Sequence, residues 1–281
     1  MSAAPDSPDF LAAMAQSSRA RVARARAERD DAALQALARA TPEPPPLRLS
    51  SAGFDLIAEV KRRSPAAGQL DAGGEDIGAR ARDYARAGAA AISVLTEPTR
   101  FDGELAHLAQ VVQALAGSAP AMRKDFLVDP YQVYEARAAG AGGVLVILRM
   151  LEPQAVSALL DAAVQTRLFV LLEAFDEADL EFAATLVRDY ADRLPLLAGV
   201  NCRDLTTLQV VPGRLEALAP RLPRNIPCVA ESGVENGADA RRLAAAGYQL
   251  ALVGSALMRA GDRVSLASEL LQSGRQGRRC G

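Results

Sequence analysis

The stretch LIAEVKRRSPAAG, residues 56–68, begins as an apolar run and then becomes charged. This change is typical of a buried β-strand that ends in a polar loop. Glu59 and Lys61 are two residues apart, so on a strand both side chains point to the same side. A carboxylate and an ammonium beside apolar neighbours are costly to bury unless they are paired or used. The stretch therefore indicates either a site at a strand end or an ion pair on an edge strand.

The same pattern recurs along the chain, with apolar segments alternating with helical ones. Strands are expected at residues 54–61, 90–95, 120–124, 143–148, 168–173, 196–201, 227–231 and 250–253, and helices at residues 76–87, 104–115, 130–139, 152–165, 177–190, 214–219, 237–246 and 263–271. Continuous apolar strands between helices indicate a parallel sheet covered on its faces. Eight such units in about 220 residues predict an α/β fold, the (β/α)8 TIM barrel. An open doubly wound sheet is the alternative, but no G-x-G-x-x-G follows the first strand.

The residues before the first strand have a different pattern. Residues 7–40 predict one long, partly exposed helix, and the proline-rich residues 41–46 cannot continue it, so they predict a stiff connector. We expect residues 1–281 to form a single TIM-barrel domain. Its N-terminal helical extension and connector would occupy about residues 1–46, and its barrel about residues 54–272.

Composition and charge exclude several kinds of function. A formal net charge of −2 over 281 residues gives no case for binding nucleic acid or a membrane surface. One histidine and three cysteines without metal-ligand spacing exclude a zinc cluster, a Ser-His-Asp triad and a disulfide scaffold. The single histidine, His107, is expected to be structural or solvated. No apolar run reaches the roughly 18 residues of a membrane span, and the N-terminus does not resemble a signal peptide, so a cytoplasmic location is expected.

Polar groups gather where the expected strands end. Active sites of TIM barrels lie at the C-terminal ends of the strands, which meet on one rim. The groups at these ends are Glu59 and Lys61, Thr96 and Glu97, Lys124, Glu173, Asn201 and Arg203, Glu231 and Ser232, and Gly254 and Ser255. A single such group would indicate only a solvated strand end. Their convergence on one rim predicts an active site.

Five segments resemble, in order, the signatures of one enzyme family. They are IAEVKRRSP (57–65), MRKDFLVDPYQ (122–132), VNCRDL (200–205), AESG (230–233) and LVGSALM (252–258). Together they resemble indole-3-glycerol phosphate synthase, a carboxy-lyase of tryptophan biosynthesis, over essentially the whole chain. The resemblance implies that 1-(2-carboxyphenylamino)-1-deoxyribulose 5-phosphate is converted to indole-3-glycerol phosphate by ring closure, decarboxylation and dehydration. It implies no cofactor and no metal, with the phosphorylated small molecule as partner, and we expect a monomer, with a dimer as the alternative.

The resemblance also implies roles for the rim residues. Lys124 resembles the general acid that protonates the oxygen that leaves. A neighbouring Glu is expected to keep this lysine charged, while burial is expected to lower the pKa of its ammonium. Lys61 resembles a second lysine that pairs with the substrate carboxylate, and Glu173 resembles the general base. The remaining catalytic positions resemble groups that hold the lysines or orient the substrate: Glu59, Glu231, Asn201 and Arg203.

A phosphate site is expected after the last two strands. Glycine lets backbone N–H groups approach an anion closely, and Gly233 and Gly254 lie at these strand ends beside Ser232 and Ser255. Ser64 resembles a residue that reaches the same phosphate. The resemblance implies an apolar slot for the aromatic ring, with walls from Pro65, Phe101, Phe126, Leu205 and Val253.

Three positions depart from the family pattern. Cys202 stands where the family usually has Asn, Ala174-Phe175 where it often has Val-His, and Ala66-Ala67-Gly68 where a lysine is usual. None of these changes removes a residue with an implied proton-transfer role.

Two other functions remain open. A barrel similar to phosphoribosylanthranilate isomerase would need a Cys/Asp pair at the first and fifth strand ends, which here carry Glu59, Lys61 and Glu173. A catalytically silent phosphate-binding paralogue would share the fold without the activity, because a fold alone does not establish function.

Overall fold

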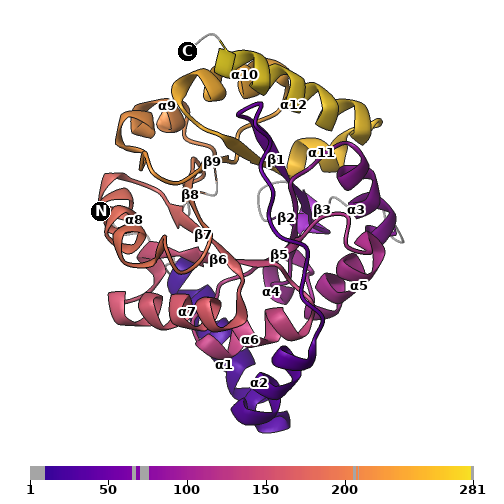
Figure 1. The fold of residues 1–281 in the computed structure, drawn as a ribbon, viewed down its shortest axis with the longest axis vertical. Helices are drawn as coiled ribbons and strands as arrows, with labels where there is room; N and C mark the ends of the chain where they lie inside the picture. Colours follow the sequence, from indigo (N-terminus) through magenta and orange to yellow (C-terminus); the bar gives the residue numbers. More distant parts are fainter. Residues whose placement is uncertain (1–9, 65–67, 70–75, 205–206, 208, 280–281) are drawn as a thin grey trace, which may run out of the picture.

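The computed structural model describes residues 10–64, 68–69, 76–204, 207 and 209–279 (Figure 1). Eight parallel strands close into a barrel in the order β1-β10-β9-β8-β7-β6-β5-β4. They are β1 (Asp55–Val60), β4 (Ala91–Leu95), β5 (Ala121–Lys124), β6 (Gly143–Ile147), β7 (Phe169–Ala174), β8 (Leu196–Asn201), β9 (Cys228–Glu231) and β10 (Leu250–Val253). The expected (β/α)8 barrel is confirmed, because each strand lies between its two parallel neighbours and helices surround the closed sheet.

Helices cover the outside of the barrel. The long ones are α3 (Ile77–Arg86), α5 (Leu105–Leu115), α6 (Pro130–Ala138), α7 (Pro153–Thr166), α8 (Glu177–Tyr190), α10 (Gly237–Ala246) and α12 (Arg263–Arg279). The short ones are α4 (Pro98–Phe101), α9 (Arg214–Leu218), α11 (Ser255–Arg259), η1 (Leu148–Met150) and η2 (Ala219–Arg221). Side chains of Asp76, Asp129, Asp176 and Asn236 accept backbone N–H groups at the starts of α3, α6, α8 and α10. These caps satisfy amide donors that a helix start otherwise leaves without partners.

The interior of the barrel has an apolar layer to which all eight strands contribute. Its residues are Ile57, Ala91, Met122, Leu145, Ile147, Phe169, Leu171, Leu197, Val229, Leu250 and Leu252. Side chains alternate along a strand, so the residue two positions further on points to the same face. Glu59, Lys124, Glu173 and Glu231 each follow a layer residue by two. The alternation therefore places four ionisable groups directly above an apolar floor.

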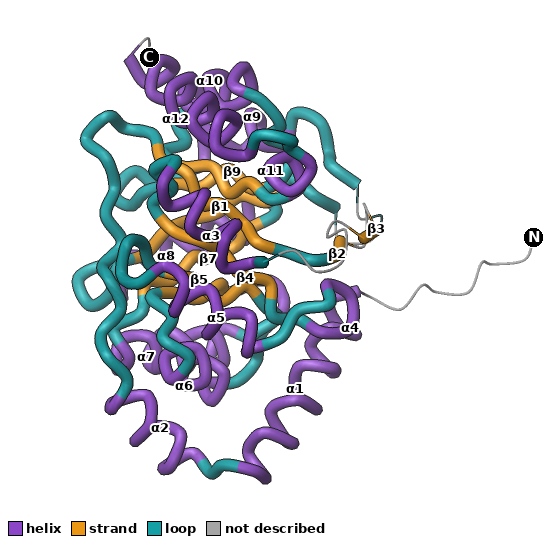
Figure 2. The backbone as a smooth tube through the Cα atoms, turned by 90° about the vertical axis from the view of Figure 1, so that its right-hand side faces the viewer, coloured by secondary structure: helices purple, strands orange, loops and turns teal. Residues whose placement is uncertain are grey.

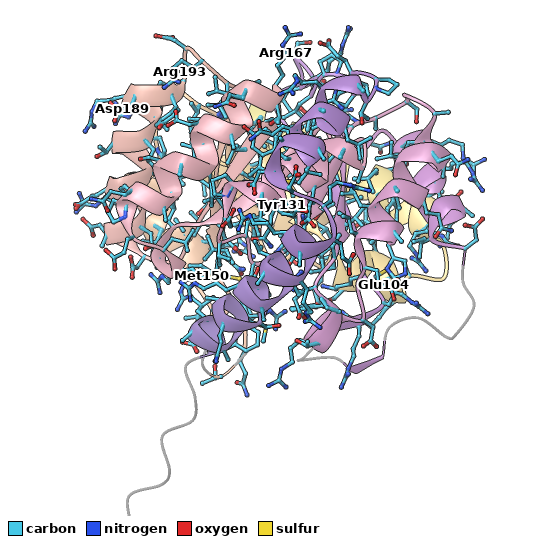
Figure 3. The ribbon with its side chains drawn as sticks, turned by 90° about the horizontal axis from the view of Figure 1, so that it is seen from below. Glu104, Tyr131, Met150, Arg167, Asp189 and Arg193 are labelled. Carbon is cyan, nitrogen blue, oxygen red and sulfur yellow. The ribbon has the colours of Figure 1, made fainter. Side chains whose placement is uncertain are left out.

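The N-terminal extension is two helices, α1 (Phe10–Glu28) and α2 (Asp31–Ala40), so the prediction of one long helix was wrong. Asp30 has extended backbone angles, φ −66° and ψ 164°, and its carboxylate accepts the N–H of Ala33 at 2.8 Å. Figure 2 shows the two helices diverging from this break. Tyr131 of α6, labelled in Figure 3, fixes the corner, because its single hydroxyl proton is shared between the carbonyls of Ala25 and Arg29, 2.9 and 2.8 Å from the hydroxyl oxygen.

The structure differs from the expected elements in two further places, the loop after β1 and the length of the last helix. A short hairpin, β2 (Arg63–Ser64) with β3 (Gly68–Gln69), follows β1. The last helix continues beyond the expected residue 271 to Arg279, and two of its glycines allow close packing. A Cβ on Gly274 would lie 2.1 Å from Phe54, and one on Gly277 would lie 2.3 Å from the carbonyl of Arg241. None of the described helices combines the length and apolar character needed to cross a membrane.

Candidate active site

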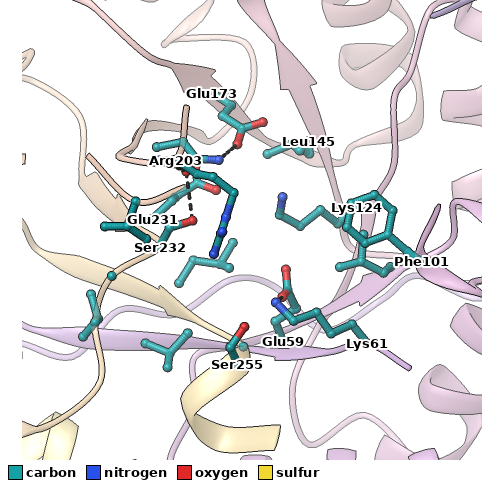
Figure 4. Close-up of a pocket in the computed structure, with 18 of the residues that line it drawn as sticks. Glu59, Lys61, Phe101, Lys124, Leu145, Glu173, Arg203, Glu231, Ser232 and Ser255 are labelled. Atoms are coloured by element: carbon teal, nitrogen blue, oxygen red, sulfur yellow. Dashed lines mark hydrogen bonds and ion pairs between the residues drawn. The ribbon is translucent and has the colours of Figure 1, made fainter. Parts of the chain in front are cut away.

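A cavity of about 310 Å³ opens at the rim where the strands end (Figure 4). All eight barrel strands or the loops directly after them contribute to its wall. Among the predicted site residues, it is lined by Glu59, Lys61, Phe101, Lys124, Phe126, Glu173, Asn201, Arg203, Glu231, Ser232, Gly233, Val253, Gly254 and Ser255. Pro65 and Leu205 lie outside the described residues. Ser64 belongs to β2, but its side chain is also outside the described part of the structure. The structure thus brings the polar ends of six strands together around one space, whereas Thr96 and Glu97 at the end of β4 do not line it.

Glu59 and Lys61 form an ion pair on one side of the cavity. Their Oε1 and Nζ atoms are 2.6 Å apart, and Glu59 is only 4% exposed. Burial acts to raise the pKa of the Glu59 carboxyl, but the charges of Lys61 and Lys124 outweigh it and hold that pKa below its usual range. Glu59 is therefore a carboxylate at neutral pH.

Lys124 ends β5 and points into the cavity among carboxylates, as Figure 4 shows. Burial acts to lower the pKa of its ammonium, but the charges of Glu173, Glu59 and Glu231 raise that pKa above its usual value. The expectation that a neighbouring Glu keeps Lys124 charged is confirmed, but the expected net lowering of its pKa was wrong. The carboxylates stabilise the protonated form, so Lys124 is a charged ammonium in the cavity.

Asn201 holds the neighbouring carboxylate in a defined direction. Its Nδ2 donates to Oε1 of Glu173 at 2.5 Å, and its Oδ1 accepts the N–H of Arg203 and the hydroxyl of Ser232, both at 2.9 Å. Two donors on Oδ1 fix the orientation of the amide. Glu173, 2% exposed, thus has one oxygen fixed by Asn201 at the top of β7.

Glu231 is the most unusual group of the site. It is 1% exposed, and neither carboxyl oxygen has a hydrogen-bond partner among the described residues. Burial and the nearby charge of Glu173 raise the pKa of Glu231 well above its usual value. Gly199 of β8 makes the room, because a Cβ there would lie 2.0 Å from Oε1 of Glu231. A buried polar group without a partner indicates a contact that is completed by something else, such as a substrate.

The loop after β9 has two successive residues in the left-handed region, Ser232 with φ +67° and Gly233 with φ +69°. Such a conformation is uncommon for serine and turns backbone amides toward one side of the loop. Cys202 packs beneath it, where its Sγ lies 3.3 Å from the carbonyl of Ser232. Burial raises the pKa of the Cys202 thiol, so this departure from the family pattern is an uncharged packing residue.

Aromatic rings form the opposite end of the cavity. The ring centroid of Phe126 lies 6.2 Å from that of Phe101 and 5.8 Å from that of Phe10, the latter edge to face. Phe10 belongs to α1 and lines the cavity, a role that the sequence analysis missed. Leu145 and Ile147 of β6 add apolar wall nearby. The wall formed by the phenylalanines and β6 is thus apolar, whereas the ends of β1, β5, β7, β8 and β9 present ionisable or polar side chains.

Several other positions have structural roles. Nδ1 of His107 accepts the N–H of Glu104 at 3.1 Å at the start of α5, so the structural reading of His107 is confirmed. Glu97 caps α4 and does not line the cavity. Phe175 is buried against the guanidinium of Arg149, 4.8 Å from its ring centroid. Among the described residues, no group of three or more His, Cys, Asp and Glu side chains is placed to hold a metal ion.

A compositional signal for this site was also missed. The chain has only two lysines, Lys61 and Lys124, among 32 Lys and Arg residues. Arginine stays protonated at any working pH, whereas the lysine ammonium can give up its proton. Both lysines line the cavity, so every lysine ammonium of this chain is in the candidate site.

Comparison with known proteins places the chain in a family. The model of the family "Indole-3-glycerol phosphate synthase" matches residues 11–270. A relative of that name from Leifsonia xyli subsp. xyli is 42% identical over 264 residues, 93% of this chain and 97% of that protein. One from Opitutus terrae is 40% identical over 235 residues, 81% and 85% of the two chains. The solved structure of 3-hexulose-6-phosphate synthase from Salmonella typhimurium is similar in fold alone, with a TM-score of 0.62, 14% identity, and coverage of 80% of this chain and all of that one. The chain belongs to the indole-3-glycerol phosphate synthase family.

Proposed function

We propose that this protein closes the pyrrole ring of 1-(2-carboxyphenylamino)-1-deoxyribulose 5-phosphate, with loss of carbon dioxide and water, and that the cavity residues carry out the proton transfers. The observation that carries the proposal is the position of Lys124. A charged lysine lies among Glu173, Glu59 and Glu231 at the centre of a cavity with an apolar end and a polar end. The substrate has matching parts: an aromatic ring, a hydroxylated chain and a phosphate.

The two ends of the cavity would hold the two ends of the substrate. The ring fits against Phe101 and Phe126, and the phosphate fits the backbone of the loops after β9 and β10, where Gly233 lies in the left-handed region. Arg259 also lines the cavity at this end. Binding both ends would place the carbonyl of the chain near the centre, which reduces the entropic cost of ring closure.

Ring closure joins the aromatic carbon that bears the carboxylate to the carbonyl carbon of the chain. The carbonyl oxygen gains negative charge as the bond forms, and Lys124 is placed to stabilise and protonate it. Loss of carbon dioxide leaves an electron pair that restores the aromatic ring. Lys61, next to Glu59, would hold the substrate carboxylate until that step.

Dehydration then needs an acid and a base. The hydroxyl formed from the carbonyl oxygen leaves as water when it receives a proton, and a base takes up the proton released as the double bond forms. Glu173 is the proposed base because Asn201 fixes one of its oxygens and leaves the other available to substrate. Glu231 would complete its missing hydrogen bonds with a substrate hydroxyl.

The experiment is to incubate purified protein with this substrate and follow the fluorescence of the indole product. We expect turnover by the parent protein and a loss of about 10²-fold or more in Lys124→Ala, the usual scale of acid–base catalysis. Lys124→Arg is the matched variant, since arginine keeps the positive charge but does not donate a proton at neutral pH. We expect its turnover to be lowered as well. Absence of product from the folded parent protein would favour the silent paralogue. Turnover near the parent level in Lys124→Ala would exclude Lys124 as the acid.

A further inference from the structure

Asp125, which follows Lys124 directly, is held by donors from three parts of the molecule. Its side chain is fully buried and accepts five hydrogen bonds. Arg21 of α1 donates two, at 2.7 and 2.8 Å, and Arg123 of β5 donates one at 3.0 Å. Thr96, after β4, donates its hydroxyl at 2.8 Å, and the N–H of Phe126 donates at 2.8 Å. The carboxylate therefore joins the N-terminal extension to the end of the strand that carries Lys124.

A second contact ties the same loop to α1. The hydroxyl of Ser18 donates to the carbonyl of Phe126 at 2.5 Å, and Nε2 of Gln132 donates to Oγ of Ser18 at 2.9 Å. Oε1 of Gln132 accepts the N–H of Val128 at 2.8 Å. Residues 125–128 are thus anchored at the side chain of Asp125 and along the backbone, and α1 contributes to both anchors.

The Arg21 pair has the geometry of a positioning contact. A bidentate guanidinium–carboxylate pair fixes direction as well as distance, unlike the single-point contact of a lysine. Burial acts to raise the pKa of Asp125, but Arg21 and Arg123 outweigh it and hold that pKa well below its usual range, so the pair stays charged. Arg21 is the only one of the three side-chain donors that comes from outside the barrel.

We propose that Arg21 is a positioning residue which, through Asp125, holds Lys124 where it can protonate the substrate. The inference rests on the proposed function, because it takes Lys124 to be the acid. Lys124 and Asp125 are joined by a peptide bond. A backbone shift at Asp125 therefore also moves the backbone of Lys124 and displaces its ammonium from the surrounding carboxylates. A displacement on the order of 1 Å at a reacting group can cost about 10²-fold in rate.

The test variant is Arg21→Gln, with Arg21→Lys as the conservative variant. Asp125 keeps Arg123, Thr96 and the N–H of Phe126 in both, so no lone charge is buried and we expect folded protein by circular dichroism. Arg21→Gln should lower kcat about tenfold while KM stays within about threefold, because the cavity ends that bind the substrate are unchanged. Arg21→Lys should restore part of the loss.

Arg26→Gln is the matched control from the same helix. Arg26 pairs with Asp129 at 2.8 Å and lies over the ring of Tyr131, so it also joins α1 to α6, but it does not contact Asp125. We expect kcat of Arg26→Gln to equal that of the parent. Equal losses of kcat in Arg21→Gln and Arg26→Gln, with equal losses of Tm, would reduce Arg21 to a structural brace.

A double-mutant cycle separates this inference from the proposed function. If Arg21 acts through Lys124, then Arg21→Gln should not lower further the residual kcat of Lys124→Ala. The same tenfold loss with and without Lys124 would overturn the inference. Failure of the proposed function is a different result, namely absence of product from the folded parent protein. Turnover near the parent level in Lys124→Ala alone would exclude Lys124 as the acid.

Discussion

A Cβ on Gly254 would lie 2.1 Å from Oε1 of Glu59 and 2.9 Å from Nζ of Lys61. Gly254 follows β10, which pairs with β1, so the end of one strand makes room for the ion pair at the end of its neighbour. From its place at a strand end, this glycine was expected to allow the close approach of a phosphate. Its contact with Glu59 is a separate reason why a side chain is excluded here.

The first prediction follows from this contact. Gly254→Ala should displace the carboxylate of Glu59 from Lys61 and lower kcat/KM by about tenfold or more, while adding one methyl group costs about 1–3 kcal/mol of stability. Steady-state kinetics and thermal unfolding measure the two effects. Gly261→Ala is the control, because a Cβ there meets nothing within 4 Å. Parent-level kcat/KM in Gly254→Ala would show that the spacing of the Glu59–Lys61 pair is unimportant.

The second prediction concerns Asn201. Asn201→Asp keeps the shape of the side chain but replaces the donor to Glu173 with a second carboxylate, which repels it. We expect kcat to fall about tenfold or more, with KM changed less. Asn236→Asp is the matched control, since aspartate caps a helix as well as asparagine does and Asn236 caps α10. Equal kinetics of the two variants would contradict a role for Asn201 in holding the base.

Much of this site could be predicted from local rules. Alternation along a strand places Glu59 two residues after the floor residue Ile57, and Lys124 two residues after Met122. The ends of parallel strands share one rim, so these positions converge without knowledge of any long-range contact. The single-domain organisation, the oligomeric state and the cytoplasmic location stay predictions.

What could not be predicted depends on contacts between distant segments. Arg21 and Asp125 are 104 residues apart, and nothing local to either indicates the partner. Whether burial or the carboxylates decide the pKa of Lys124 depends on how many carboxylates surround it, which only the folded barrel shows. The start of α4, in contrast, has a local signal that was overlooked. Glu97 before Pro98 has the pattern of a cap followed by a first-turn proline.

The third prediction concerns stability and pH at Glu231. Its pKa is raised in the folded protein, whereas an unfolded glutamate titrates near about 4.3. As pH rises above that value the unfolded state ionises first, so Glu231 lowers stability increasingly until the folded group ionises too. Glu231→Gln should therefore raise Tm at pH 8 by about 2–4 °C, corresponding to roughly 1 kcal/mol, and lower turnover.

The gain in Tm should be smallest at pH 4, where the folded group is protonated and the unfolded one is mostly protonated. Glu235→Gln is the control, because Glu235 is exposed in the loop beyond β9 and its removal changes no buried charge. Unfolding curves of both variants from pH 4 to pH 8 measure the effect. A Tm gain of the same size at all pH values would show that Glu231→Gln acts through packing and not through ionisation.

The last prediction concerns the pH profile and the assignment of Glu173. A charged lysine and an ionised glutamate must coexist, so activity should follow a bell. It should fall at low pH as a carboxylate takes up a proton and at high pH as a lysine loses one. The carboxylates around Lys124 raise its pKa, so the alkaline limb should lie above the ordinary lysine value of about 10.4, and both limbs belong to the cluster rather than to single residues.

Glu173→Gln keeps the side-chain shape and can still accept the hydrogen bond from Asn201, but it cannot take up a proton from substrate. It should lower kcat about 10²-fold or more, leave KM within about threefold, and shift or abolish the acidic limb. Full kcat with an unchanged acidic limb in Glu173→Gln would place the base elsewhere, and Glu59 would be the next candidate because its carboxylate lines the same cavity.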